Sequence, residues 1–212
     1  FVPVPDLQAA IVEDISGMAI GHLATGLLEA HGIDEGGIPD QGIGGHDEMW
    51  FAARDLAFGP DAYPDVEPQP GLAREDATRY LPEVSEEIEQ ILSFIANVLI
   101  IEFRAEIGFA ETQAVLTTPG LFGERAADAA LGAEIVGRIR TDEEIHVRSL
   151  NLYLGELSNV TFCTLDGGTI AGSELIDRFW DGMVEWATVI KPASDAKKAR
   201  ADLSALIDTH PE

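Results

Sequence analysis

Residues 95–116, IANVLIIEFRAEIGFAETQAVL, carry two acids within a largely apolar row. The row repeats at alternating steps of four and three residues and consists of Ile95, Leu99, Glu102, Glu106, Phe109, Gln113 and Leu116. Because this spacing keeps side chains on one face of an α-helix, the stretch predicts a long helix within residues 81–119. A carboxylate on such a face is energetically costly unless it is paired, protonated or bound to a metal ion. The acids therefore indicate a functional site on this face.

A second row of the same kind lies within residues 122–160 and predicts a second long helix. It consists of Ile135, Ile139, Glu143, His146, Leu150, Tyr153 and Leu157. The only strong break between the two predicted helices is the turn at residues 118–123, which contains Pro119, Gly120 and Gly123. A connection this short makes the two helices an antiparallel pair.

The acids of the two predicted helices lie at the same level in this arrangement. Glu102 precedes Pro119 by 17 positions and Glu143 follows Gly123 by 20 positions, so both lie about 25–30 Å from the turn. His146 follows Glu143 by three residues, which places both side chains on one helical face. Carboxylates and an imidazole at one level are suitable donors for a transition metal. Glu102, Glu143 and His146 therefore predict half of a carboxylate-bridged dimetal site.

The segments VLIIE, which ends at Glu102, and TDEEIH, which ends at His146, resemble the second half of the ferritin-like superfamily. Over residues 90–157 the sequence resembles the sequences of rubrerythrins and aldehyde-deformylating oxygenases. The resemblance implies an all-α, ferritin-like up-down helical bundle with a long crossover. Such bundles place one Glu from each of two helices and a Glu-x-x-His from each of the other two around two iron or manganese ions. By this resemblance, Glu102 matches a lone Glu, and Glu143 with His146 matches a Glu-x-x-His.

The first half of the sequence departs from the ferritin-like pattern, because no Glu-x-x-His occurs before residue 60. Glu13, Glu29 and Glu48 are followed at that spacing by a serine, a glycine and a phenylalanine. The remaining ligands are therefore arranged differently, or the site holds a single metal ion, or the site has been lost.

His22 and Glu13 are the candidate ligands from the predicted first helix. The apolar pattern predicts this helix from Asp6 to about residue 31 and places His22 beside its apolar stripe. A histidine in such a position is commonly a hydrogen-bonded residue at the edge of the core, so this structural role stays open beside metal ligation.

His46 and Glu48 are the candidate ligands from a helix predicted over residues 46–58. The structural alternative is that acids in this first turn suit the positive end of the helix dipole, while Trp50 and Phe51 pack against the bundle. The glycine-rich residues before this helix, 32–45, predict a loop that is long enough to suggest a lid or a binding role.

The composition limits the possible partners and locations. A net charge of −25 at pH 7 argues against binding to nucleic acid or to anionic membranes, because phosphate contacts need Lys and Arg. The single Cys163 excludes an intrachain disulfide and a cysteine metal cluster, and the expected location is cytoplasmic. The longest uncharged apolar run, residues 91–101, is too short to cross a bilayer. The sequence begins at Phe1 and not at methionine, which is compatible with a leader outside this sequence.

Residues 1–160 are predicted to form the bundle. Within them, the proline-rich and acidic residues 59–80 predict an irregular crossover between two helix pairs. Pro82 is expected in the first turn of the long helix that follows, where its missing N–H does no harm.

Residues 161–212 are predicted to form a C-terminal appendage that packs on the bundle. Residues 161–170 alternate in polarity and contain Asp-Gly, which predicts a small β-hairpin. Two helices are predicted after it, over residues 173–190 and 194–207, with Pro192 ending the first of them.

These features predict a non-haem dimetal oxidoreductase that activates O2 or peroxide on a small-molecule substrate. The cofactor is expected to be two iron ions, with manganese as the alternative, and Glu106 is a further ligand or a proton donor. Phe94, Ile95, Leu99 and Phe109 would favour a small apolar substrate. A homo-oligomer is compatible with the apolar face of the C-terminal helix.

Three alternatives follow from the same residues. The first is a ferroxidase-type iron-handling protein, and the second is a bundle that has lost its site and acts as a binding or structural protein. In the third, the acids belong to a partly exposed ion-pair network with Arg104 or Arg148.

Overall fold

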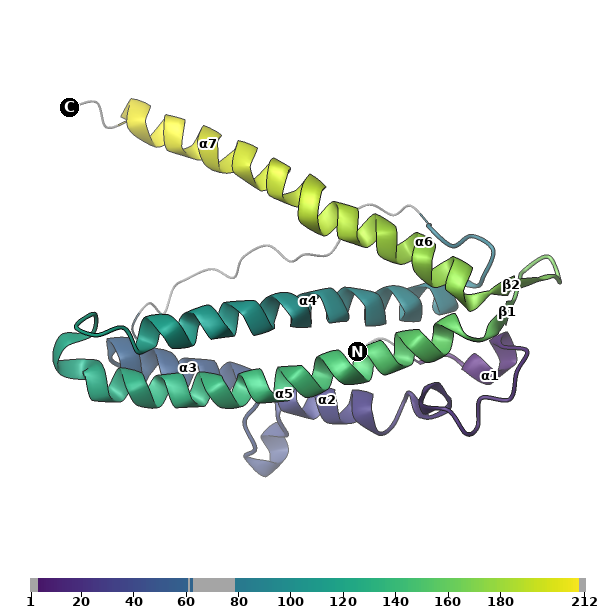
Figure 1. The fold of residues 1–212 in the computed structure, drawn as a ribbon, viewed down its shortest axis with the longest axis horizontal. Helices are drawn as coiled ribbons and strands as arrows, with labels where there is room; N and C mark the ends of the chain where they lie inside the picture. The colour runs from purple at the N-terminus through teal and green to yellow at the C-terminus, as the bar shows by residue number, and fades with distance from the viewer. Residues whose placement is uncertain (1–3, 61, 63–78, 210–212) are drawn as a thin grey trace.

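Two long antiparallel helices form the centre of the molecule (Figure 1). The computed structural model describes residues 4–60, 62 and 79–209. The two helices are α4 (Glu86–Leu116) and α5 (Ala126–Ser158), joined by a turn that includes the 3-10 helix Gly123–Arg125. Both predicted long helices and their antiparallel pairing are therefore confirmed.

Helix α4 begins later than the sequence pattern predicted. Its N-cap is Ser85, whose side chain accepts a hydrogen bond from the backbone N–H of Ile88. This cap satisfies one of the free N–H groups of the first turn and sets the start of the helix. Pro82 precedes the cap, so its predicted place in the first turn was wrong. The predicted crossover falls mainly at positions 61 and 63–78, which lie outside the described residues.

Helices α2 (Leu27–Gly36) and α3 (His46–Phe58) lie along α5 (Figure 1). The prediction of a helix over residues 46–58 is confirmed. The prediction of a loop over residues 32–45 was wrong for its first part, because α2 continues to Gly36. A positive φ of 65° at Gly37 ends the helix there.

The predicted first helix, from Asp6 to about residue 31, was also wrong. Over residues 4–26, the structure has only α1 (Leu7–Ala10) and the 3-10 helix Ala19–His22 before α2. The side chain of Gln8 accepts a hydrogen bond from the backbone N–H of Ile15, which holds the chain in a bend. This hydrogen bond satisfies a backbone N–H locally and replaces one of the backbone hydrogen bonds of the predicted helix.

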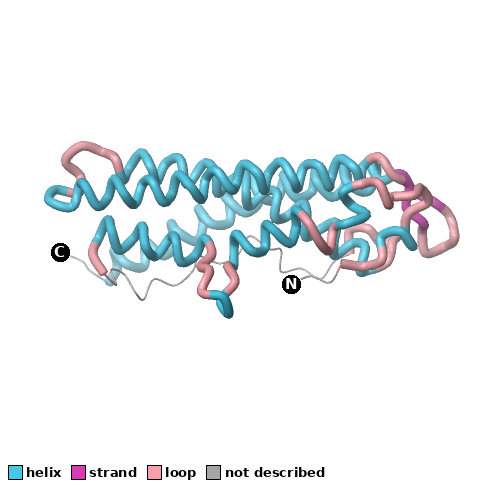
Figure 2. The backbone as a smooth tube through the Cα atoms, turned by 90° about the horizontal axis from the view of Figure 1, so that it is seen from below, coloured by secondary structure: helices cyan, strands magenta, loops and turns pink. Residues whose placement is uncertain are grey.

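A small β-hairpin follows α5 and confirms the prediction for residues 161–170. Strands β1 (Thr161–Cys163) and β2 (Thr169–Ala171) pair antiparallel, and they lie at the end of the bundle opposite to the α4–α5 turn (Figure 2). The hairpin also holds the N-terminal segment, since Ile11 forms a bridge with Phe162.

Helix α6 (Gly172–Glu185) continues through a π-helical turn (Trp186–Ile190) into α7 (Lys191–Thr209), which projects away from the bundle (Figure 1). The prediction that Pro192 ends the helix was wrong. In an α-helix, proline removes one hydrogen bond and clashes with the carbonyl four residues earlier. The wider turn before Pro192, in which the N–H of Lys191 bonds to Trp186 O, accommodates this clash without a break. The division into a bundle and an appendage stays a prediction.

The core consists of two apolar clusters with a polar layer between them. The larger cluster includes Leu99 of α4 and Leu150 of α5, and the smaller one includes Leu116 of α4 and Val136 of α5. Along both long helices, the sequence between these clusters carries the buried acids and histidine of the predicted site. The protein is therefore a mostly helical bundle, and none of its described helices combines the length and the apolarity that a membrane span needs.

Candidate metal centre

Six side chains with metal-binding atoms gather where α2, α3, α4 and α5 meet. They form two groups, in each of which the possible ligand atoms all lie within 4.8 Å of one another. The first group consists of His31, Glu35, Glu102 and His146, and the second consists of Glu35, His46 and Glu143. Glu35 belongs to both groups. The protein thus has buried histidines and glutamates that could hold a metal ion.

Helix geometry positions four of these side chains in pairs. His31 and Glu35 are four residues apart on α2, and Glu143 and His146 are three residues apart on α5. Both spacings put the members of a pair on one helical face, one turn apart. The two faces point toward each other across the bundle, so that a pair from each helix contributes to one cluster.

His46 reaches the cluster through a tight turn between α2 and α3. A side chain at Gly45 would place its Cβ 2.3 Å from the backbone oxygen of Glu35, and one at Gly37 would lie 2.3 Å from the oxygen of Ile43. Only glycines permit backbone segments to approach this closely. The turn therefore brings the first residue of α3 beside the last turn of α2.

His31 lies against both long helices. Its Nε2 is 2.9 Å from Oε1 of Glu102, and its ring stacks on that of His146 with a centroid distance of 3.8 Å and an angle of 6°. The Nδ1 atom of His31 is buried and has no hydrogen-bond partner within the described part of the chain. An unpaired buried nitrogen is costly, so this ring has capacity for a further ligand or proton.

The second group, Glu35, His46 and Glu143, lies next to His146 of the first group. Nδ1 of His46 is 2.9 Å from Glu35 Oε1 and 3.3 Å from Glu143 Oε1. Nδ1 of His146 is 2.9 Å from Glu143 Oε2 and 3.6 Å from Glu35 Oε1. The carboxylates of Glu35 and Glu143 thus each lie between the same two imidazoles.

Two aspartates lie behind these imidazoles. Oδ2 of Asp34 is 3.2 Å from Nε2 of His146, and Oδ2 of Asp142 is 3.5 Å from Nε2 of His46. In metal sites, a carboxylate on the far nitrogen of a ligating histidine fixes the tautomer and the orientation of the ring. Asp34 is placed to do so for His146. Among the described residues, Nε2 of His46 has no hydrogen-bond partner, so Asp142 makes only an ion pair with it at 3.5 Å.

Burial is uneven across the cluster. Glu102, Glu143, His31, His46 and His146 are between 2 and 6% exposed. The side chain of the sixth member, Glu35, is 46% exposed. The centre is therefore enclosed on the side of the long helices and opens to solvent along α2.

The two buried carboxylates of the long helices share a hydrogen bond and differ in acidity. Burial raises the pKa of Glu102 to about 7, and the hydrogen bond with Glu143 adds to this against the opposing effect of His31. Burial acts in the same direction at Glu143, but hydrogen bonds from His146 and His46 outweigh it and hold the pKa of that carboxyl well below its usual range. Glu143 is therefore the carboxyl of the pair that carries the negative charge, and Glu102 takes up a proton more readily.

The histidines compensate this charge. Burial alone would lower the pKa of His46, but hydrogen bonds to Glu143 and Glu35 outweigh burial and raise its pKa to about 10. Hydrogen bonds to Glu143 and Asp34 likewise raise the pKa of His146. The cluster is thus built to hold positive charge next to its carboxylates.

Four of the predicted site residues lie in this cluster and four lie outside it. Those inside are Glu102, Glu143, His146 and His46. His22 is exposed, and its Nε2 lies 3.1 Å from the backbone oxygen of Ser16. Glu48 is exposed on α3, outside both groups. Glu106 lies one turn beyond Glu102 on α4, and Nη2 of Arg140 donates a hydrogen bond of 2.9 Å to it.

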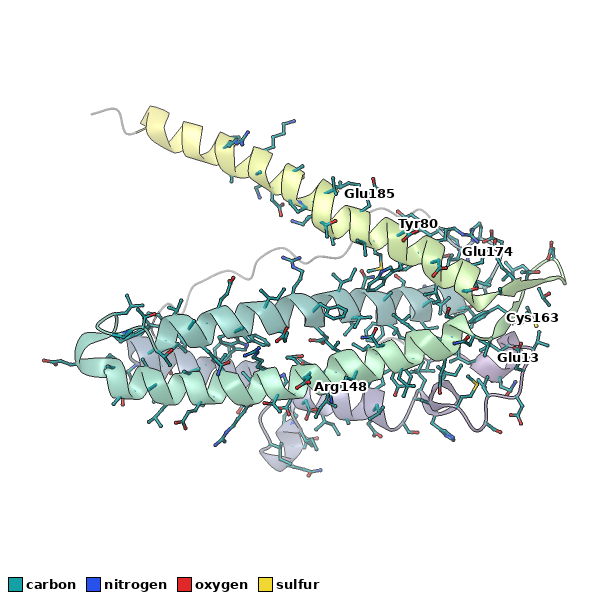
Figure 3. All side chains as sticks on the ribbon, in the orientation of Figure 1. Glu13, Tyr80, Arg148, Cys163, Glu174 and Glu185 are labelled. Carbon is teal, nitrogen blue, oxygen red and sulfur yellow. The ribbon has the colours of Figure 1, made fainter. Side chains whose placement is uncertain are left out.

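Glu13 also lies away from the cluster. Its carboxylate accepts hydrogen bonds of 2.8 Å from the backbone N–H and from the hydroxyl of Thr161 at the hairpin (Figure 3). Arg148 of the alternative ion-pair network lies on α5 and pairs with Glu144 at the surface (Figure 3). Among the described residues, the ion pairs of Glu102, Glu143 and His146 join glutamates or aspartates to histidines and involve no arginine.

Sequence reasoning missed His31 and Glu35. The signal that could have found them is their spacing of four residues, which puts a histidine and a glutamate on one face of a helix. The apolar pattern predicts a helix that ends near residue 31 and a loop after it, which leaves Glu35 outside any predicted helical face. Comparisons of this chain with protein-family models, with curated proteins and with solved structures found no match.

Proposed function

We propose that the chain is a non-haem dimetal oxidoreductase of ferritin-like type that acts with O2 or peroxide on a small molecule. The observation that carries the proposal is the position of Glu35, which belongs to both groups of possible ligand atoms. A carboxylate has two oxygens and can serve two ions at once. One shared carboxylate between two ligand groups is the arrangement that a dimetal centre requires.

The donor set suits iron or manganese. It consists of three imidazoles and three carboxylates, without any thiolate. Imidazole and carboxylate are ligands of intermediate to hard character, which suit divalent iron and manganese better than copper(I) or a sulfur-bound cluster. Three ionised glutamates would also balance most of the charge of two divalent ions, and the acidic surface attracts cations to the site.

In this proposal, the protein chain supplies positions, charge and solvent exclusion. His31, Glu102, Glu143 and His146 hold the buried side of the centre, and the more exposed Glu35 closes it. The metal ions supply the redox chemistry with O2 or peroxide. Asp34 would orient the imidazole of His146.

Glu106 stays a predicted proton donor. It lies on the same face of α4 as Glu102, one turn away. The guanidinium of Arg140 holds its carboxylate in place through hydrogen bonds of 2.9 and 3.2 Å. A role in proton transfer would therefore need Arg140 to release it.

Metal stoichiometry tests the proposal directly. The protein is reconstituted anaerobically with Fe(II) or Mn(II), freed of excess metal and analysed by elemental analysis, with two ions per chain expected. Glu35→Ala is expected to lose metal at both positions because it removes the shared ligand. Glu48→Ala, an exposed glutamate outside both groups, is the matched control and keeps both ions.

The redox part of the proposal needs a second measurement. The iron-loaded protein is expected to consume O2 or peroxide in the presence of a reductant, and the Glu35→Ala variant to lose this activity. Absence of stoichiometric metal in the wild-type protein, or unchanged metal content in Glu35→Ala, contradicts the proposal.

A further inference from the structure

A cavity of about 380 Å³ lies between α2 and α4 and reaches the candidate metal centre. Its apolar wall includes Leu23, Leu28, Phe94, Val98 and Ile101. Its polar wall includes three members of the cluster, namely His31, Glu35 and Glu102. The cavity thus joins an apolar space to the ligand groups of the centre.

This cavity lies at the edge of the larger core cluster, against which Phe94 and Val98 pack. Phe94, Val98 and Ile101 follow one another at steps of four and three residues and form a stripe of α4 beside the core stripe. The neighbouring Ile95 and Leu99 are fully buried, whereas Phe94 and Val98 are half-buried and Ile101 is 44% exposed. The cavity therefore opens to solvent near Ile101, which provides a path of entry.

The cavity is elongated and has a direction. Phe94 and Glu102, both in its wall, are eight residues apart on α4, which corresponds to about 12 Å along the helix. On α2, the wall runs from Leu28 and the exposed Glu29 to His31 and Glu35. Leu28 and Phe94 thus lie toward one end of the cavity, and the possible metal ligands lie toward the other.

We propose that this cavity binds the organic substrate of the centre, a molecule with a linear apolar body and its reacting end toward Glu35 and Glu102. The inference builds on the proposed function and adds the class of substrate. An apolar wall favours an apolar body because burial removes it from water.

The experiment uses the Mn(II)-loaded protein and the probe 1-octanol, with binding followed by calorimetry. Val98→Phe fills the cavity and is expected to weaken octanol binding about ten-fold or more, which corresponds to 1.4 kcal/mol. Val115→Phe adds the same side chain on α4 at a half-exposed position outside the cavity, and is expected to bind octanol like the wild type. Ile101→Trp at the exposed mouth is a second blocking variant that leaves the core untouched.

One further readout tests the direction of the ligand. The paramagnetic Mn(II) is expected to broaden the NMR signals of the protons next to the hydroxyl more than those of the methyl end. The opposite order of broadening overturns the proposal.

The metal content of each sample separates this inference from the proposed function. If the wild-type protein holds two ions but binds no octanol, the cavity proposal alone is overturned. The same conclusion follows if both blocking variants bind octanol as tightly as the wild type. Octanol binding that the blocking variants abolish, in protein that holds no metal, supports the cavity as a ligand site and overturns the dimetal function.

Discussion

Oε1 of Glu35 lies 2.9 Å from Nδ1 of His46, although one residue closes α2 and the other opens α3. The chain between them reverses through the antiparallel bridge of Ile38 and Ile43, and Gly45 passes the backbone of Glu35 at close range. This contact joins the two ligand groups of the centre. A substitution in this turn should therefore alter the geometry of the metal site without replacing a ligand.

Gly45→Ala is expected to weaken Mn(II) binding and to lower the free energy of unfolding by about 1–3 kcal/mol, because the new Cβ would lie 2.3 Å from the oxygen of Glu35. Gly36→Ala is the control, since a Cβ there meets no atom within 4 Å. Isothermal calorimetry and denaturant unfolding measure the two effects. Equal metal affinity in both variants would show that this turn does not position Glu35 and His46.

Asp34→Asn is expected to weaken metal binding by about 10- to 100-fold, as replacement of the carboxylate behind a ligating histidine generally does. The variant weakens the contact of 3.2 Å from Oδ2 of Asp34 to Nε2 of His146 but keeps the shape of the side chain. Asp40→Asn, an exposed aspartate in the turn after α2, serves as the control. The affinity for Mn(II) is measured by competition with a chelator, and a purely structural role of Asp34 would leave it unchanged.

Metal binding is expected to stabilise the fold, because the ligands converge from four helices only in the native state. At a free Mn(II) concentration of about 100 times Kd, the free energy of unfolding should rise by about 2.7 kcal/mol. A chelator should reverse this gain, and His31→Ala should reduce it. Thermal unfolding monitored by circular dichroism measures the effect, and His22→Ala is the matched histidine control outside the cluster. A gain that is equal in both histidine variants would contradict the assignment of His31.

Gly172→Ala is expected to destabilise the protein by about 3 kcal/mol or more, because its Cβ would lie 1.9 Å from the backbone oxygen of Leu157, where the hairpin returns to α5. Gly182→Ala within α6 meets no atom within 4 Å and should stabilise the helix by up to about 1 kcal/mol. Denaturant unfolding of both variants tests the packing of the hairpin on α5. Similar stability of the two variants would contradict the close approach at Gly172.

The ion pair between Glu83 and Arg178, with an N–O distance of 2.8 Å, makes a small pH-dependent contribution. The hydrogen bond from Arg178 lowers the pKa of Glu83, so the stabilisation is present above the ordinary glutamate pKa and is lost as the pH falls through the lowered value. Because both side chains are more than one-third exposed, Glu83→Gln should cost only about 0.5 kcal/mol at pH 7. This difference should disappear in acid and in high salt, and unfolding at a series of pH values measures it. A difference that grows as the pH falls would contradict the sign.

The local sequence pattern determined much of the central helix pair and the convergence of its side chains. The apolar rows fix which faces of α4 and α5 are buried, and the short turn at residues 118–123 forces the antiparallel pairing. Because both properties are local, Glu102, Glu143 and His146 could be placed together from the sequence. His46 could be named as a candidate, but its contacts with Glu35 and Glu143 could not be predicted.

The tertiary structure alone decided how the first half of the chain completes the cluster. The spacing of apolar residues suggested one helix ending near residue 31, whereas contacts with the hairpin and bends at Gln8 and Gly26 delay the helix to Leu27 and extend it to Gly36. This shift puts His31 and Glu35 on a helical face. Helical periodicity can tell which residues share a face, but the partner of that face depends on contacts between segments far apart in the chain.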